Sequence, residues 1–271
     1  MTELSEALVL VAEACLIDAM KILLDHGADP NHAFQNITKT TKNIRAIHLL
    51  LDYGADVHMD DDAALMVSAK YNYSTVAKLL LDYGANIHAL DDQALNISLK
   101  KNSYDTMKLF LEYGVNISSI TEDAIHKSIR NDCVDTLELL LQSGLDIKHI
   151  DFHHHLLRGY SLTTEMINLL LSHGLDIHKD DDYLFRMQVN VRQIGVVTFL
   201  LDNQANIHAN NDEALTQSCR NGDCAMIKLL LQYGATSHHI HITDEFPTKI
   251  INLLLEKGAI DNRNYRDSDD D

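Results

Sequence analysis

One short pattern recurs along this chain and limits what it can fold into: three apolar residues, two spacers and then a glycine. The first copy is Ile22-Leu23-Leu24-Asp25-His26-Gly27, and Gln204 stands where one of the later glycines is due. From Gly54 to Gly234 the copies follow one another at a step of 30 residues. A fixed period of this length predicts a solenoid, in which each unit packs on its neighbours and presents an extended surface. Such a surface favours binding over catalysis. The closing glycines are Gly27, Gly54, Gly84, Gly114, Gly144, Gly174, Gly234 and Gly258.

Each unit is expected to contain two helices. In the segment from Asp92 to Gly114, apolar residues recur at steps of three and four on both sides of Asn102, as they do in amphipathic helices. The joint between the helices holds residue types that tolerate a left-handed backbone, and the closing glycine fits a left-handed C′ position. A serine one turn into the first helix leaves room for adjacent helices to approach. The joint column is Asn72, Asn102, Asp132 and Gly222, and the serine column is Ser68, Ser98, Ser128 and Ser218.

Acidic residues gather where each first helix begins. Aspartates stand at the expected N-cap position, and negative charge there also complements the helix dipole, by ~0.3–1 kcal/mol per charge. This interpretation is favoured because Lys70, Lys100, Arg130 and Arg220 stand at the other end of the same helices. The alternative is an acidic ladder that attracts a basic partner. The expected N-caps are Asp62, Asp92, Asp182 and Asp212.

The unit resembles the ankyrin repeat. The resemblance is carried by Leu-Leu-Leu-x-x-Gly-Ala-Asp/Asn-Ile/Val, preceded by a short helix and a tight joint, and it covers roughly residues 4–262. Ankyrin units usually have 33 residues and begin with Thr-Pro-Leu-His, whereas this chain has Asp-x-Ala-Leu, as at Asp92 to Leu95. The resemblance therefore implies an all-α ankyrin solenoid with shortened hairpin tips. The 30-residue period and the Asn, Ile, Asp and Lys content resemble the ankyrin proteins of giant DNA viruses of amoebae.

The predicted organisation is a single array of about nine units over residues 1–262, followed by a disordered acidic tail over 263–271. The second and last units are degenerate: residues 35–41 are polar and β-branched where a first helix is due, and the last step is only 24 residues, with Pro247 beginning a helix. Residues 150–195 form a weak joint, because His155, Arg158 and Gln188 replace apolar or small residues. At the other end, Ser5 is a predicted N-cap for an apolar first helix, which either an upstream unit or a partner would cover unless it is an imperfect cap.

Composition excludes several classes of partner. The net charge is −18 with histidine neutral, which disfavours nucleic acid and anionic membrane surfaces. Residues 1–24 contain apolar runs, but acidic residues interrupt them, so neither a signal peptide nor a membrane span is expected. Four cysteines in 271 residues do not make a disulfide framework. We therefore expect reduced thiols and a cytoplasmic location, the host cytoplasm if the protein is viral.

The histidines raise the question of a metal site. Most of the 16 histidines fall in one repeating column, where the resemblance implies a loop-bracing role and a spacing between units too wide for two of them to share a zinc ion. The clusters at 153–155 and 238–241 lack the spacing of a zinc motif. No phosphate loop, nucleophile elbow or His-Glu-x-x-His is present. We expect no cofactor and no enzymatic activity. The repeating column is His32, His58, His88, His178, His208 and His238.

The sequence predicts a protein-binding scaffold or adaptor that engages host proteins if it is viral. The alternatives are a structural or virion-associated spacer and, more remotely, a histidine-based metal-binding protein. The resemblance implies that specificity lies on the concave side, at the hairpin tips and the outward positions of the first helices. A protein partner with an apolar ridge and basic flanks is expected, bound by a monomer. The predicted partner-binding column is Val67, Ile97, Lys127, Leu157, Met187 and Gln217.

Overall fold

The computed structural model describes residues 2–40, 43–148, 161–236, 242 and 246–259. Within these residues the secondary structure is entirely helical. The chain divides into two compact units, unit 1 over Met1–Asp146 and unit 2 over Ile147–Asp271. The predicted acidic tail, 263–271, lies outside the described residues, and the single continuous array stays a prediction.

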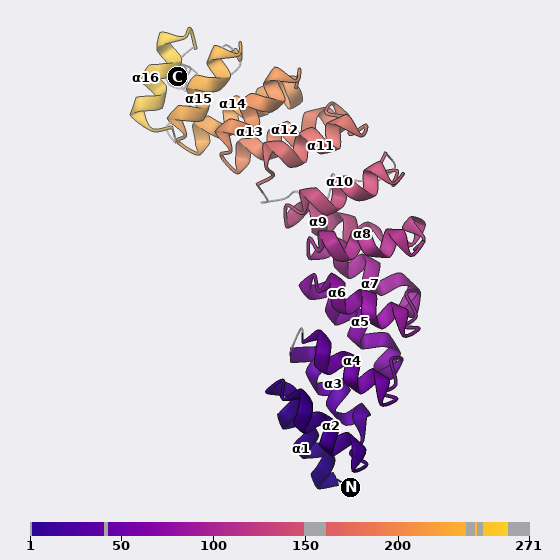
Figure 1. Ribbon diagram of the computed structural model, residues 1–271. Helices are drawn as coiled ribbons and strands as arrows, with labels where there is room; N and C mark the ends of the chain where they lie inside the picture. Colours follow the sequence, from indigo (N-terminus) through magenta and orange to yellow (C-terminus); the bar gives the residue numbers. More distant parts are fainter. Residues whose placement is uncertain (1, 41–42, 149–160, 237–241, 243–245, 260–271) are drawn as a thin grey trace, which may run out of the picture. The chain divides into compact units, whose positions relative to one another are not determined.

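Unit 1 consists of five helix pairs that follow one another in chain order (Figure 1). The helices of each pair are short, as expected for 30-residue units, and one 3₁₀ turn precedes the fifth pair. The elements are α1 (Thr2–Glu13), α2 (Ile17–Asp25), α3 (Pro30–Thr40), α4 (Ile44–Asp52), α5 (Met59–Tyr71), α6 (Ser74–Asp82), α7 (Ala89–Lys100), α8 (Tyr104–Glu112), η1 (Ile117–Ser119), α9 (Glu122–Arg130) and α10 (Val134–Gln142).

Unit 2 repeats the same scheme with helix pairs α12–α13 and α14–α15. Its described part begins with a second helix, α11, because residues 149–160 lie outside the described residues. The last helix, α16, begins directly after Pro247, as the sequence predicts. The elements are α11 (Thr164–Ser172), α12 (Lys179–Asn190), α13 (Ile194–Asp202), α14 (Ala209–Arg220), α15 (Cys224–Gln232) and α16 (Thr248–Glu256).

Within each unit the helices form two layers. First helices pack on first helices, from α1 on α3 through α7 on α9 in unit 1 and α12 on α14 in unit 2. Second helices likewise pack on second helices, from α2 on α4 through α8 on α10, and from α11 through α13 to α15. The core lies between the layers, where repeated leucine and alanine columns are buried, among them Leu65, Leu95 and Leu80, each at most 1% exposed.

The backbone turns follow the sequence columns. Asn72, Asn102 and Asp132 have φ of 55°, 54° and 54° at the joint between paired helices, and Gly222 has φ of 69°. The closing glycines are also left-handed, and Gln204, which replaces one of them, has φ of 70°. Both predictions about these turns are confirmed. Asn, Asp and Gly populate this region at least cost, which explains their choice here.

The acidic segments before four first helices adopt a conformation that the sequence did not predict. Asp60, Asp61 and Asp62 all lie near φ 52–60° and ψ 33–51°, forming a left-handed turn before the right-handed helix. The equivalent residues are Leu90–Asp92, Asp180–Asp182 and Asn210–Asp212. Aspartate and asparagine dominate these segments because they tolerate left-handed geometry better than other L-residues.

The N-cap prediction for these aspartates is wrong. The Asp62 carboxylate does not cap its own helix; it accepts from His58 Nδ1 at 3.2 Å and from the backbone N–H of Asn86, in the next repeat, at 2.8 Å. Asp182 makes the same two contacts with His178 and the Asn206 N–H. Asp62 and Asp182 therefore bind one repeat to the next rather than capping a helix, while the carboxylates of Asp92 and Asp212 accept from His88 and His208.

Two further expectations about the start of the chain are corrected. Ser5 is not an N-cap: it lies within α1, and its Oγ accepts from the Asp29 N–H at 3.0 Å. The segment expected to have lost its first helix forms α3, with Phe34 and Ile37 buried at 1% and 0% exposure. The Thr38 hydroxyl donates a hydrogen bond to the Phe34 carbonyl at 2.8 Å, so this buried polar group has a partner within the helix.

Candidate partner-binding surface

The predicted column in unit 1 lies on the outward side of consecutive first helices. Val67 on α5 and Ile97 on α7 are half-buried, and Lys127 on α9 is exposed. The residue that follows each of them is the buried serine of the repeat, Ser68, Ser98 and Ser128, at 1%, 0% and 0% exposure. Helical geometry thus places the serine against the next helix and the column residue beside solvent. The role of the column in binding stays a prediction.

In unit 1 the column begins earlier than the sequence analysis assumed. Alignment of the buried positions puts Leu10 of α1 and Asn36 of α3 in the same register, because Leu8 corresponds to Leu65 and Phe34 occupies the same buried position in α3. Leu10 is 68% exposed, and Asn36 is half-buried. The irregular sequences of the first and second repeats concealed this register. The available signal was the spacing from Leu8 to Leu10, which equals the spacing from Leu65 to Val67.

Unit 2 contains two described members of the column. Met187 on α12 and Gln217 on α14 are both half-buried, beside Gln188 and Ser218, which are 0% and 1% exposed. The Gln217 side chain donates to Asn221 Oδ1 at 3.1 Å within its own helix. Leu157 lies outside the described residues. The structure therefore brings together Val67, Ile97 and Lys127 in one unit, and Met187 and Gln217 in the other.

A small notch lies beside Val67, between α3 and α5. Its lining includes the apolar side chains of Phe34, Ala64 and Val67, together with Asp60. Gln35 Nε2 donates to Asp60 Oδ2 at 2.8 Å, which fixes this carboxylate. The notch has a volume of ≈ 10 Å³, about the room that one water molecule needs. It can receive the tip of an apolar side chain but not a small-molecule substrate.

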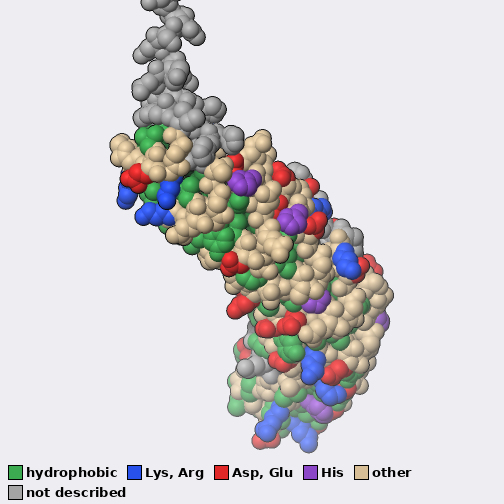
Figure 2. All heavy atoms as spheres, turned by 90° about the horizontal axis from the view of Figure 1, so that it is seen from above, with side chains coloured by type: hydrophobic (Ala, Val, Ile, Leu, Met, Phe, Trp, Pro, Cys, Tyr) green, Lys and Arg blue, Asp and Glu red, His purple; other side chains and the backbone are tan. Residues whose placement is uncertain are grey.

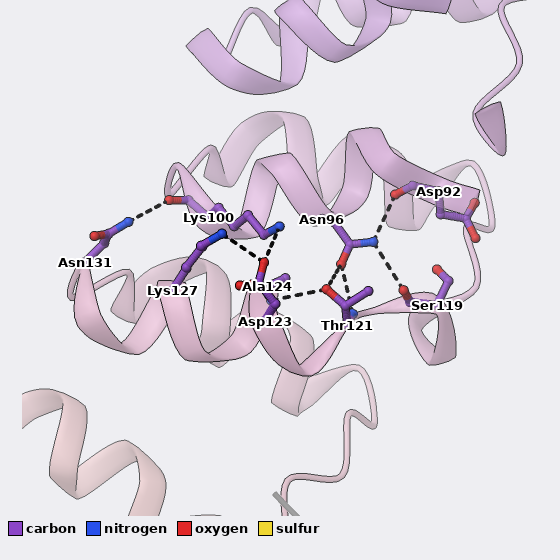
Figure 3. Close-up of polar contacts among 9 residues, drawn as sticks. All are labelled: Asp92, Asn96, Lys100, Ser119, Thr121, Asp123, Ala124, Lys127 and Asn131. Carbon is purple, nitrogen blue, oxygen red and sulfur yellow. Dashed lines mark hydrogen bonds and ion pairs between the residues drawn. The ribbon is translucent and has the colours of Figure 1, made fainter. Parts of the chain in front are cut away.

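Lys127 belongs to a charged group at the junction of α7 and α9 (Figure 3). Its Nζ lies 3.1 Å from Asp123 Oδ2, and Lys100 Nζ approaches the same oxygen at 2.9 Å. The hydrogen bond from Lys100, and then that from Lys127, holds the pKa of the Asp123 carboxyl below its usual range. Two ammonium groups share one carboxylate, so this end of the column carries a local positive charge.

Asn96 performs at this junction the bracing that aspartates perform elsewhere. Its Oδ1 accepts from the N–H and hydroxyl of Thr121, at 2.9 and 3.1 Å, while Nδ2 donates to the carbonyls of Asp92 and Ser119 (Figure 3). Asn96 is 6% exposed, so these bonds compensate the burial of the amide. Thr121 in turn caps α9 by accepting from the Ala124 N–H. The rigid junction positions Ile97 and Lys127.

Four of the repeating histidines directly precede a first helix, His32 lies within α3, and His238 lies outside the described residues. In four repeats the histidine Nδ1 lies 2.6–3.2 Å from a carboxylate oxygen of the buried aspartate four residues later. On the face shown in Figure 2 the histidines stand apart from one another. No group of three or more metal-ligating side chains occurs among the residues that the structure describes. The observed pairs fit the loop-bracing role. They are His58–Asp62, His88–Asp92, His178–Asp182 and His208–Asp212.

In unit 2 an arginine network lies beside Met187. Arg186 forms an ion pair with Glu213 of the next first helix and donates to the carbonyls of Asp180 and Asp181, at 3.1 and 2.9 Å. Asn210 Nδ2 also donates to the Glu213 carboxylate, at 2.8 Å. The network joins α12 to α14 and fixes the turn at the start of α12, beside the half-buried Met187.

Comparison with known proteins agrees with this architecture. Residues 8–91 match the family model described as ankyrin repeats (3 copies). No curated protein matches the chain. The match supports the ankyrin repeat family, and with the paired helices in two layers it identifies the fold as an all-α ankyrin repeat solenoid.

Ankyrin repeats generally mediate protein–protein interaction and are typically non-enzymatic scaffolds. The match covers the first column positions, from Leu10 to Val67. Within the described residues, none of the helices combines the length and apolar character needed to cross a bilayer.

Proposed function

We propose that this chain is a non-catalytic binding scaffold whose protein partner docks on the outward side of the first helices. The observation that carries the proposal is the half-buried apolar column of Val67, Ile97 and Met187. Each of these side chains lies beside fully buried residues, so it is held in place while one side stays accessible. Rigid apolar positions of this kind lose little entropy on binding, which is what binding anchors require.

The proposal extends to the setting of the protein. An adaptor that engages host proteins in the host cytoplasm fits the 30-residue unit, whose shortened form resembles the ankyrin proteins of amoebal viruses. The net charge of −18 favours partners that bring basic groups, because like charge opposes encounter. A monomer presents the column positions of each unit to such a partner.

Site-specific photo-crosslinking tests the location of the site. A benzophenone amino acid at position 67, 97 or 187 should crosslink a protein from host lysate, and the same group at Ile44 or Ile194 should not. These two control positions begin second helices and are 39% and 40% exposed. Equal crosslinking from the second helices would place the binding surface elsewhere.

A further inference from the structure

The column of unit 1 lies between two edges of opposite charge. On α5, Asp61 precedes the right-handed helix and Lys70 lies in its last turn. On α7, Asp91 takes the same place as Asp61, while Lys101 directly follows the helix, one position beyond Lys100, which is the equivalent of Lys70. The side chains of Asp61, Lys70, Asp91 and Lys101 are exposed, and among the described residues none of them forms an ion pair; the Lys70 ammonium group lies 5.0 Å from the centroid of the Tyr71 ring. The acidic edge continues to Asp60, whose carboxylate accepts from Gln35. Two apolar positions, Val67 and Ile97, thus have uncompensated carboxylates on one side and uncompensated ammonium groups on the other.

The width of this strip matches one secondary-structure element. Eight helical steps from Asp62 to Lys70 correspond to about 12 Å, and an α-helix with its side chains is ~10–12 Å wide. Adjacent packed helices lie ~8–10 Å apart, and seven residues of a helix rise ~10.5 Å. A helix lying across α5 and α7 therefore places residues i and i+7 of one face on Val67 and Ile97.

We infer that unit 1 binds an amphipathic helix with basic residues along one flank and acidic residues along the other. The inference rests on the proposed function and specifies the partner of that site. The apolar ridge of this helix covers Val67 and Ile97, and one apolar tip enters the notch beside Phe34. Its basic flank faces Asp61 and Asp91.

The acidic flank of the partner distinguishes this inference from simple attraction to an acidic protein. Lys70 and Lys101 line the second edge, and Lys127 and Lys100 extend the positive charge toward α9, where they share Asp123. A helix with lysine on both flanks would place ammonium groups against this edge. Since charges are screened over ~8 Å at physiological salt, the two edges, about 12 Å apart, act separately.

Fluorescence anisotropy with three synthetic helices tests the inference on the full chain at 0.15 M salt. The helices have about 20 residues and share one leucine ridge. The first carries lysine on one flank and glutamate on the other, the second lysine on both flanks, and the third glutamate on both. We expect the first to bind about fivefold more tightly than either of the others, from a few exposed ion pairs.

Charge reversal on the protein supplies the matched test. The double variant K70E/K101E should lose its preference for the first helix and favour the helix with lysine on both flanks. The control K108E/K228E makes the same change of net charge on second helices, at exposed residues, and should keep the original preference. Ile97→Asp should abolish binding of all three peptides, which ties them to this surface.

Several results would overturn the inference. They are tighter binding of the lysine-flanked helix to the unaltered protein, an unchanged preference in K70E/K101E, and no binding by any peptide. If the lysine-flanked helix binds best and Ile97→Asp removes it, the two-flank inference fails while the proposed function stands. If the peptides bind but Ile97→Asp leaves binding intact, the proposed surface fails as well.

Discussion

Aspartates 62, 92, 182 and 212 show how one side chain serves two purposes in this chain. Each occupies a left-handed backbone position, which its short polar side chain tolerates. Each residue is also at most 8% exposed, and its carboxylate accepts from a histidine of its own loop. In two of them the structure adds a bond from the backbone of the next repeat. The repeat pattern identified these aspartates, but it predicted that they cap their own helices. The backbone N–H that Asp62 accepts from lies 24 residues away, and local sequence does not reveal a contact at that distance.

Replacing Asp62 tests this inter-repeat bond. Asp62→Ala leaves the Asn86 N–H without its acceptor, so we expect the free energy of unfolding to fall by about 1–3 kcal/mol in urea denaturation. Asp61→Ala is the control: it changes the same residue type in the same left-handed turn, but its carboxylate is exposed. Equal losses in the two variants would show that only the backbone conformation matters.

The cysteines provide a second test at this scale. Burial raises the pKa of the Cys219 thiol to about 12, so at pH 8 very little of it is the reactive thiolate. Cys15 is exposed. Maleimide labelling followed by mass spectrometry should modify Cys15 long before Cys219, with Cys219 reacting only after denaturation. Rapid labelling of native Cys219 would contradict its burial.

At the scale of the element, the turns of the repeat could be predicted from sequence and the loops only in part. Asn102 and the closing glycines reveal their geometry because left-handed positions restrict residue choice locally. Helix α3 escaped prediction because its polar and β-branched composition has weak helix propensity, which burial of Phe34 and Ile37 overrides. The full extent of the column was not predicted for a related reason. Leu10 and Asn36 lie in repeats whose register is defined only by the positions that the structure shows to be buried.

Gly114 tests the closing turn of the repeat. It has φ of +77°, and an added Cβ would meet nothing within 4 Å, so any loss of stability comes from the backbone conformation. Gly114→Val should lower the free energy of unfolding by more than ~1 kcal/mol. Gly114→Asn should cost less, because asparagine tolerates the left-handed region. Thermal or urea denaturation that ranks the two variants equally would contradict this explanation.

At the scale of the whole molecule, the links between repeats are unevenly distributed. Directly after four of the second helices, a tyrosine donates to an aspartate of the preceding repeat; these are tyrosines 53, 83, 113 and 233. The bond raises the pKa of Tyr53, Tyr83 and Tyr233, because ionisation would place two negative charges together. The same position holds Ser143, His173 and Asn203 in three consecutive repeats, so the Tyr–Asp link is absent there.

This distribution predicts how the molecule opens. Since solenoid stability is a sum over repeats and their interfaces, residues 161–195 should exchange their amide hydrogens sooner than residues 62–144. Gln188 reduces the expected difference in exchange rate between the two segments. Its side chain is fully buried, but its Oε1 accepts from the Leu162 N–H at 3.4 Å, so the buried amide has a partner. Hydrogen exchange with mass spectrometry compares the two segments directly. Uniform protection would show that the missing tyrosine links do not weaken this part of the chain.

The most direct test of the binding account is affinity capture from cell lysate with a double variant, quantified by mass spectrometry. Ile97→Asp with Met187→Asp places one charge on the column of each unit, and should abolish capture while circular dichroism and thermal denaturation show a folded protein. Ile44→Asp with Ile194→Asp changes the first residue of a second helix in each unit, where aspartate is well tolerated, and should leave capture unchanged. A folded Ile97/Met187 variant that still captures the same proteins would contradict the account, and so would loss of capture in the control.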